Sequence, residues 1–193
     1  MGSCALFPAL LLLLAAGSGA ETTTTKPAAS ALDQVCGGLG GWYVTPSLCT
    51  SALCSTSPSA SDSCRAARDA PAVAALAARL AARNATAAQR SIQDTSSAAA
   101  ATNATTSSSG GAEEAVRSCL RLYAGAVPAL HWAAASVSAG RYRGATEVLQ
   151  MAQYVAAGCE GIVAPPAALP PENGRFGDMA FVAHAVVASM ARN

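Results

Sequence analysis

Two long segments between Gly111 and Val163 repeat apolar residues at steps of three and four, the spacing that gathers side chains on one face of an α-helix. In the first segment the repeating positions are Val116, Cys119, Leu120, Tyr123, Val127, Leu130, Ala134 and Val137. In the second they are Ala145, Leu149, Ala152, Ala156, Cys159 and Ile162 or Val163. Ala139-Gly140 separates the segments, and glycine can supply the left-handed residue that commonly ends a helix. The pattern predicts two antiparallel helices joined by a short turn.

Each of these two helices carries one cysteine at a similar distance from the turn. Cys119 lies about 21 residues before Gly140, and Cys159 lies about 19 residues after it. The two thiols should therefore face each other at bonding distance. A disulfide bond between them would close a loop of roughly 40 residues, which the chain-entropy model values at about 4 kcal/mol.

The helical period continues on both sides of this hairpin. From Arg65 to about Thr106 it predicts a long helix, and we keep the helix after Gly111 intact across Pro128 because the apolar period continues beyond the proline. After a non-helical connector at 164–171, we expect Asn173 to cap a last helix. That helix would place on one face Phe176, Met179, Ala183, Val186 and Met190. With no strand-like alternation in the chain, the fold class is all-α: an up-down-up-down four-helix bundle with an N-terminal helical hairpin, stapled by disulfides.

The first 20 residues have the pattern of a secretory signal peptide, with an apolar run that is too short to span a bilayer. Residues 21–30 form a polar leader that we expect to be disordered. The predicted helical domain covers 31–193, with the N-terminal hairpin at 31–65 and the bundle at 66–193. The remaining chain has no second apolar span, so a secreted protein is expected.

Six cysteines remain after the signal peptide, and six cysteines allow 15 pairings. An even number in an exported chain favours disulfide bonds, whereas zinc is disfavoured because the chain has no C-x-x-C pair and its two histidines are far apart. Two short helices at 31–65, the second starting at Thr45-Pro46-Ser47, would be tied by Cys36–Cys49. Cys54–Cys64 would close the Ser-rich loop that follows. Asn84 and Asn103 each begin an N-x-T sequon for glycosylation.

These residues together resemble the plant invertase/pectin methylesterase inhibitor family. The matching pieces are Tyr43-Val44-Thr45-Pro46-Ser47-Leu48-Cys49, Asn84-Ala85-Thr86, Ser118-Cys119-Leu120-Arg121-Leu122-Tyr123, Ser138-Ala139-Gly140-Arg141-Tyr142, Gly158-Cys159-Glu160 and the helix at Asn173. The resemblance implies the pairs Cys36–Cys49 and Cys119–Cys159. Three features depart from the family pattern: the pair Cys54–Cys64, the glycines between Cys36 and Cys49, and Pro128.

The resemblance also implies a function: a monomeric extracellular protein of the plant cell wall that inhibits an enzyme. It would block the carbohydrate-binding cleft of that enzyme in a one-to-one complex. Inhibitors of acid invertase in the family tend to carry Pro-Lys-Phe where this chain has Gly140-Arg141-Tyr142. We therefore favour pectin methylesterase as the target, with cell-wall or vacuolar acid invertase as the alternative. As residues that contact the target, we select Arg141, Tyr142 and Glu147 near the turn, because interfaces favour tyrosine and arginine.

Other classes of function are less well supported. The formal net charge of +1 lacks the basic excess of nucleic-acid binders. His131 and His184 are the only imidazoles, no nucleophile elbow or H-E-x-x-H pair is present, and acidic residues are sparse, so catalysis is not expected and neither is a cofactor. A structural or lipid-carrying secreted helical protein remains a remote alternative, although a tight Ala- and Leu-lined bundle leaves little room for an acyl chain.

Overall fold

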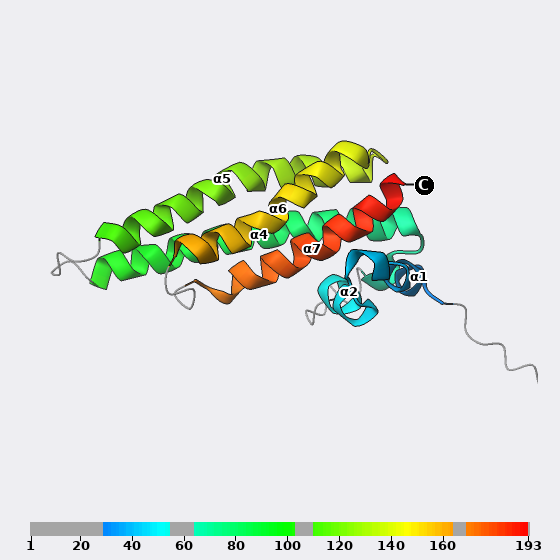
Figure 1. The fold of residues 1–193 in the computed structure, drawn as a ribbon, viewed down its shortest axis with the longest axis horizontal. Coiled ribbons are helices and arrows are strands. Elements are labelled where there is room, and N and C mark those ends of the chain that lie inside the picture. Colours follow the sequence, from blue (N-terminus) through cyan, green and yellow to red (C-terminus); the bar gives the residue numbers. More distant parts are fainter. Residues whose placement is uncertain (1–28, 55–63, 103–109, 164–168, 193) are drawn as a thin grey trace, which may run out of the picture.

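The structure is a computed structural model that describes residues 29–54, 64–102, 110–163 and 169–192. Regular structure in these ranges is helical throughout, without strands. The long helices are α4 (Ala70–Thr102), α5 (Gly110–Ser138), α6 (Arg143–Ile162) and α7 (Pro171–Ala191). Figure 1 shows them side by side along one axis, with α1 (Ala31–Gly37) and α2 (Pro46–Leu53) at the end of the bundle that holds the C-terminus. The predicted all-α bundle with an N-terminal helical hairpin is confirmed.

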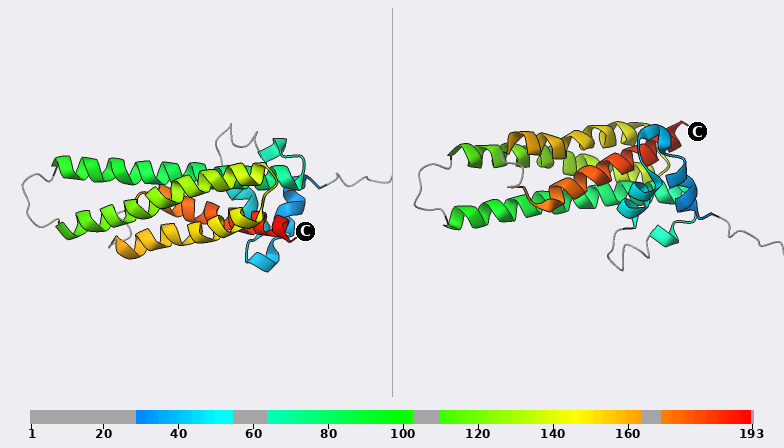
Figure 2. Two further views of the ribbon diagram at one scale, coloured as in Figure 1. Left: turned by 90° about the horizontal axis from the view of Figure 1, so that it is seen from above. Right: turned by 60° about the horizontal axis from the view of Figure 1, so that its bottom comes forward.

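The four long helices close a ring in which each one packs on two others. α4 contacts α5 and α7, and α6 contacts the same two helices from the opposite corner. The two turned views in Figure 2 show the same elongated bundle, with the N-terminal hairpin against one end of it. In that hairpin α1 rests on α4, and α2 contacts both α4 and α7. A short 3-10 turn, Gly40–Trp42, connects α1 to α2.

The apolar faces read from the helical period face the core: most of their residues are buried, and Val116, Leu120, Val127 and Met190 are half-buried against it. In α6 the buried residues are the predicted Ala145, Leu149, Ala152, Ala156 and Cys159, and Val163 is buried directly after the helix. The prediction was too narrow for α7, where Val182, Ala185 and Val187 are buried in addition to the expected face. This helix lies against α4, α6 and the N-terminal hairpin, so more of its circumference is covered.

Two helix boundaries follow from capping. At the end of α5, Gly140 has φ 72°, its N–H donates to Val137 O (2.9 Å), and Arg141 N–H donates to Ser136 O (2.9 Å). This pair of bonds is a Schellman motif, so the predicted stop at Ala139-Gly140 is confirmed. The predicted start of the long helix at Arg65 was wrong: α4 begins at Ala70, because the Asp69 carboxylate caps it by accepting from Ala72 N–H (2.8 Å).

Asn173 does not cap the last helix, which is a second correction. α7 begins two residues earlier, at Pro171, and Asn173 is buried inside its first turn. Its side chain accepts a hydrogen bond from the Tyr123 hydroxyl (2.8 Å) and donates to Ala156 O (3.3 Å) and to a Glu160 carboxylate oxygen (3.2 Å). Pro171 supplies the fixed φ that a helix start favours. The Asn173 side-chain amide is therefore not used as a cap, and it links α7 to α5 and α6 through hydrogen bonds in the core.

Two of these three helices, α5 and α6, are also joined covalently near the same level. Cys119 and Cys159 form a disulfide bond with their Cα atoms 4.8 Å apart, and both side chains are fully buried. Cys119 is one helical turn before Tyr123, and Cys159 lies between Ala156 and Glu160. Burial, together with the charge of the Glu160 carboxylate, raises the pKa of Tyr123 further above its ordinary value, so this phenol stays a hydrogen-bond donor.

We predict that Tyr123→Phe lowers the free energy of unfolding by about 1 to 3 kcal/mol, because it leaves the buried Asn173 carbonyl oxygen without its donor. Urea denaturation followed by circular dichroism measures this change. Tyr154→Phe is the matched control: it removes the same atom from a side chain that is 64% exposed, and should change stability by less than about 0.5 kcal/mol. Equal stability of the two variants would show that the Tyr123 hydrogen bond does not stabilise the core.

An aromatic contact holds the N-terminal hairpin against the last helix. Trp42 meets the His184 ring edge-on, with ring centroids 5.5 Å apart, and the Arg192 guanidinium carbon lies 4.6 Å from the centre of the Trp42 ring. His184 is half-buried in this contact, and burial lowers its pKa. The contact therefore favours the neutral imidazole.

We predict that His184 makes the protein less stable as the pH falls from 7. The unfolded chain takes up a proton at the ordinary histidine pKa of about 6.5, whereas the folded protein does so only at a lower pH. The stability contributed by the neutral imidazole is therefore present above about pH 6.5 and is lost as the pH falls through the folded pKa. Urea denaturation at several pH values should show a smaller acid-side loss in His184→Phe than in the wild type. Identical losses in both proteins would contradict the prediction.

A candidate protein-binding surface on α5 and α6

Large apolar side chains that are exposed to solvent are concentrated on one helical hairpin. Among the described residues, five of the six such side chains belong to α5 or α6, and only Tyr43 lies elsewhere. The most exposed on α6 are Met151 (67%) and Tyr154 (64%). The others on this hairpin are Leu122, Trp132 and Ile162. Grouped exposed apolar side chains typically mark a site of interaction.

A groove of about 560 Å³ runs between these two helices. Gly125, Ala126 and Ala129 of α5 line one side of it, and from α6 it is lined by Val148, Met151 and Val155. The small residues of α5 leave this space open, and the apolar side chains of α6 give it a hydrophobic wall. Its lining includes one basic and one acidic side chain, Arg121 and Glu147. We refer to this groove and its exposed rim as the α5–α6 surface.

Two glycines of α6 allow large α5 side chains to lie across the hairpin. A Cβ atom at Gly158 would lie 3.1 Å from Leu122 Cδ1, and a Cβ atom at Gly144 would lie 3.2 Å from the Trp132 ring. Leu122 and Trp132 thus rest on α6 at two levels that are ten residues, or about 15 Å, apart along α5. The groove lies between these two levels, so close contacts hold α5 and α6 together toward both of its ends.

The residues expected to contact a target lie in two places. Glu147 lines the groove. Arg141 and Tyr142 lie at the hairpin turn, where Arg141 is exposed and Tyr142 is half-buried, with its carbonyl oxygen accepting the Thr146 hydroxyl (2.9 Å). The structure therefore places Glu147 on the α5–α6 surface and the other two beyond its Trp132 end.

The groove itself was missed from the sequence. Its lining from Gly125 to Ala129 consists of small residues off the core face, which look like ordinary helix positions when taken singly. The available signal was Met151 and Tyr154, two large apolar side chains that fall outside the predicted buried face of their helix. Their exposure could have indicated a surface used for contact.

The structure brings together the three cysteine pairs expected from the sequence. The Cα atoms are 5.5 Å apart in Cys36–Cys49 and 5.4 Å apart in Cys54–Cys64. Of the two sequons, Asn84 lies inside α4, half-buried, with its side-chain amide donating to Leu80 O (2.9 Å). Asn103, the expected signal peptide at 1–20 and most of the leader lie outside the described residues.

The histidines do not assemble a reactive centre. His131 on α5 lies 3.4 Å from the Thr86 hydroxyl of α4, measured from Nε2 to Oγ1, whereas His184 on α7 packs against Trp42. Within the described ranges no group of three or more His, Cys, Asp or Glu side chains could hold a metal ion. No helix in the described part of the chain is long and apolar enough to cross a membrane.

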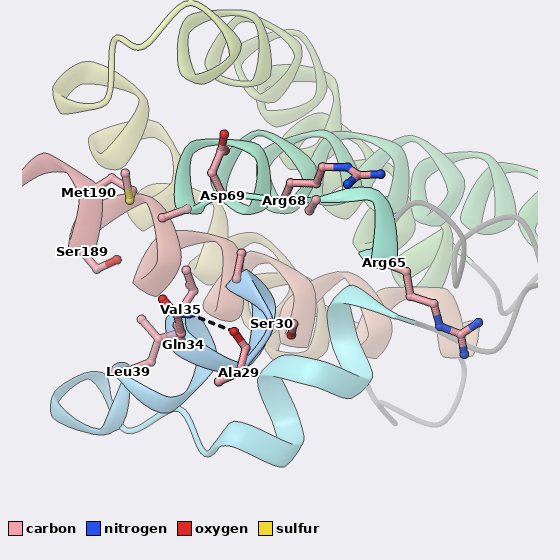
Figure 3. A pocket seen from close by; sticks show the side chains of 14 residues that line it. Ala29, Ser30, Gln34, Val35, Leu39, Arg65, Arg68, Asp69, Ser189 and Met190 are labelled. Carbon is pink, nitrogen blue, oxygen red and sulfur yellow. Dashed lines mark hydrogen bonds between the residues drawn. The ribbon is translucent and has the colours of Figure 1, made fainter. Parts of the chain in front are cut away.

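A wider cleft of about 820 Å³ lies where the N-terminal hairpin meets α4 and α7. Arg65, Arg68, Asp69 and Gln34 are among its lining residues. Figure 3 shows that the Arg65 guanidinium points away from the other labelled side chains and that the Asp69 carboxylate points away from α1. Asp69 is occupied as the cap of α4, and the Gln34 amide donates to Ala29 O (2.9 Å). The polar groups of this cleft do not converge on one point.

The fold and surface define a helical, disulfide-linked protein without an assembled catalytic centre in its described part, and comparison with known proteins gives the family. The sequence model of the plant invertase/pectin methylesterase inhibitors matches residues 30–168. The chain belongs to this family, as its residues indicated. Members of the family are extracellular inhibitors of pectin methylesterase or invertase. Neither a curated protein nor a solved structure matches the chain.

Proposed function

We propose that this protein inhibits pectin methylesterase by laying the α5–α6 surface across the enzyme's carbohydrate-binding cleft in a one-to-one complex. The observation that carries the proposal is the concentration of exposed apolar side chains around the groove between α5 and α6. A surface of this kind suits a protein partner, since apolar centres with a few charged groups at their edge are typical of interfaces.

The rigidity of the surface supports an inhibitory role. α5 and α6 are joined by the Cys119–Cys159 disulfide, by a capped turn and by packing at Gly144 and Gly158. Docking a surface that is already ordered loses little conformational entropy, so more of the contact energy appears as affinity. A lipid carrier instead encloses its ligand in a cavity, whereas this groove is lined by side chains, such as Met151, that are exposed.

The choice of pectin methylesterase over acid invertase rests on the turn between the two helices. Invertase inhibitors of the family tend to carry Pro-Lys-Phe there, and this chain has Gly140-Arg141-Tyr142. Gly140 is committed to the helix cap through its positive φ. The turn therefore presents Arg141 and Tyr142 in place of a Pro-Lys-Phe segment.

We also propose that the chain is secreted to the cell wall after removal of residues 1–20. The apolar run of that segment and the three disulfide bonds of the fold support this route, since disulfides persist in oxidising compartments. Of the two sequons, Asn103 is the better candidate for a glycan, because Asn84 uses its amide within α4.

The target is tested by mixing the purified protein with pectin methylesterase and with acid invertase in separate assays. We expect loss of esterase activity at a molar ratio near one, with invertase activity unchanged. Full inhibition of invertase with the esterase unaffected would replace the proposed target by the alternative one. Inhibition of neither enzyme would reject the proposed function.

The surface is tested by Met151→Glu, which places a charge in the apolar wall while keeping a good helix former. We expect inhibition to weaken by tenfold or more, which corresponds to about 1.4 kcal/mol of binding free energy. Ala87→Glu is the matched control, because it makes a similar change at an exposed position of α4. Circular dichroism verifies that both variants fold.

The contribution of the turn is separated by Arg141→Ala in the same assay. Weakened inhibition would extend the contact from the groove to the turn, and unchanged inhibition would confine it to the groove. If Met151→Glu inhibits as well as Ala87→Glu, the protein is an inhibitor whose docking site is not the α5–α6 surface.

A further inference from the structure

A second, smaller pocket of about 330 Å³ lies between α4 and α5, and its chemistry differs from that of the groove. Its lining includes the buried apolar side chains Leu76, Ala82 and Ala134. The rest of its lining is nitrogen-rich: Arg79 and Arg83 of α4 and His131 of α5, all exposed. No carboxylate lines this pocket.

The three nitrogen-rich side chains are brought together from two helices. Arg79 and Arg83 are four residues apart, so they are neighbours on one face of α4. Thr86, one turn further along that face, is hydrogen-bonded to Ala82 O (2.9 Å) and lies 3.4 Å from His131 Nε2. This contact fixes the imidazole beside the arginines at the edge of α5.

Neither α4 nor α5 places an acidic residue close in sequence to the pocket. In the described part of the chain neither arginine takes part in a salt bridge. The nearest acidic residues along α4 are Asp69 and Asp94, ten residues before Arg79 and eleven after Arg83, or roughly 15 Å away along the axis. This exceeds the Debye length of about 8 Å at physiological ionic strength. On α5 no acidic residue follows Glu114.

Two like charges at this spacing repel each other. An anion placed between the two guanidinium groups would be attracted by both, and this attraction would offset their repulsion. Guanidinium groups bind carboxylate and phosphate oxygens through paired hydrogen bonds. Because Nε2 of His131 faces Thr86, whose hydroxyl donates to Ala82 O, the protonated ring can add one more hydrogen bond through Nδ1. The pocket volume is near the lower end of the range for small-molecule sites.

We propose that the pocket formed by Arg79, Arg83 and His131 binds a small oxyanion with two or more negative charges, such as phosphate or a dicarboxylate. The site lies on the α4 side of α5, whereas the groove lies on the α6 side. It is open to solvent, so its affinity is expected to be in the millimolar range and to fall with added salt. The proposal does not depend on which enzyme the protein inhibits.

The two histidines provide the readout. In nuclear magnetic resonance spectra of the full mature protein at constant pH, titration with phosphate should shift the ring signals of His131 in a saturable manner. His184, which packs against Trp42 on α7, is an internal control and should not shift in this way. A parallel titration with malonate shows whether a dicarboxylate binds at the same site. A parallel titration with sodium chloride shows whether a monovalent anion alone causes the shift. Saturation by phosphate or malonate supports the site, and saturation by chloride alone contradicts it.

Variants test which side chains hold the anion. Arg79→Gln with Arg83→Gln should weaken binding by tenfold or more, or about 1.4 kcal/mol. Arg90→Gln is the matched control, because Arg90 is an exposed arginine of α4 that does not line the pocket, and it should leave the affinity within about twofold. Circular dichroism verifies the fold of each variant. Absence of a saturable His131 shift at tens of millimolar anion, or equal affinity in the double variant and the wild type, would overturn the proposal.

Discussion

The hydrogen bond between the Tyr123 hydroxyl and Asn173 fixes how the helices of this bundle stand relative to one another. Asn173 is 1% exposed, and its amide finds partners only if α5 and α6 present Tyr123, Ala156 O and Glu160 at the same level. A sliding of α7 by one turn would leave these buried groups unpaired, at a cost of about 1–3 kcal/mol for each. The Cys119–Cys159 bond holds the other two helices at that level. The polar and covalent constraints therefore specify one register.

Such a constraint matters in this chain because its core is rich in alanine. Buried alanines line all four long helices, and an alanine contributes little apolar area and little shape to guide packing. Tyr123 and Phe176 are the largest fully buried side chains, and their rings pack with centroids 5.4 Å apart beside the Asn173 amide. A few large or polar groups at one level thus determine an arrangement that many small residues would leave underdetermined. The fixed register is what gives the adjoining α5–α6 surface its shape.

The helical period correctly predicted features that depend on a single helix, such as its buried face and its end. It failed for residues whose interaction partners lie on another helix. It placed Leu149 and Cys159 on a buried face and located the turn at Gly140, because these features depend on residues close in sequence. Asn173 was assigned to a cap because asparagine favours that position, but its main partner is Tyr123, 50 residues away. Asp69 followed by Pro71 is a local start signal for α4 that could have been read. The groove could not be predicted from the sequence, since it exists only when Ala126 and Met151 are brought side by side.

α5 contributes to two surfaces of different chemistry, and adjacent residues divide them. His131 is directed to α4, where it meets Thr86, whereas Trp132 is directed to α6, where its ring lies over Gly144. Neighbouring residues of a helix point about 100° apart, so a single step in sequence moves from the basic pocket to the apolar surface. α5 packs between α4 and α6, which separates the two sites by its own width. Because the register of α5 is fixed at Tyr123, neither surface can change its position on the bundle without breaking the buried bond to Asn173.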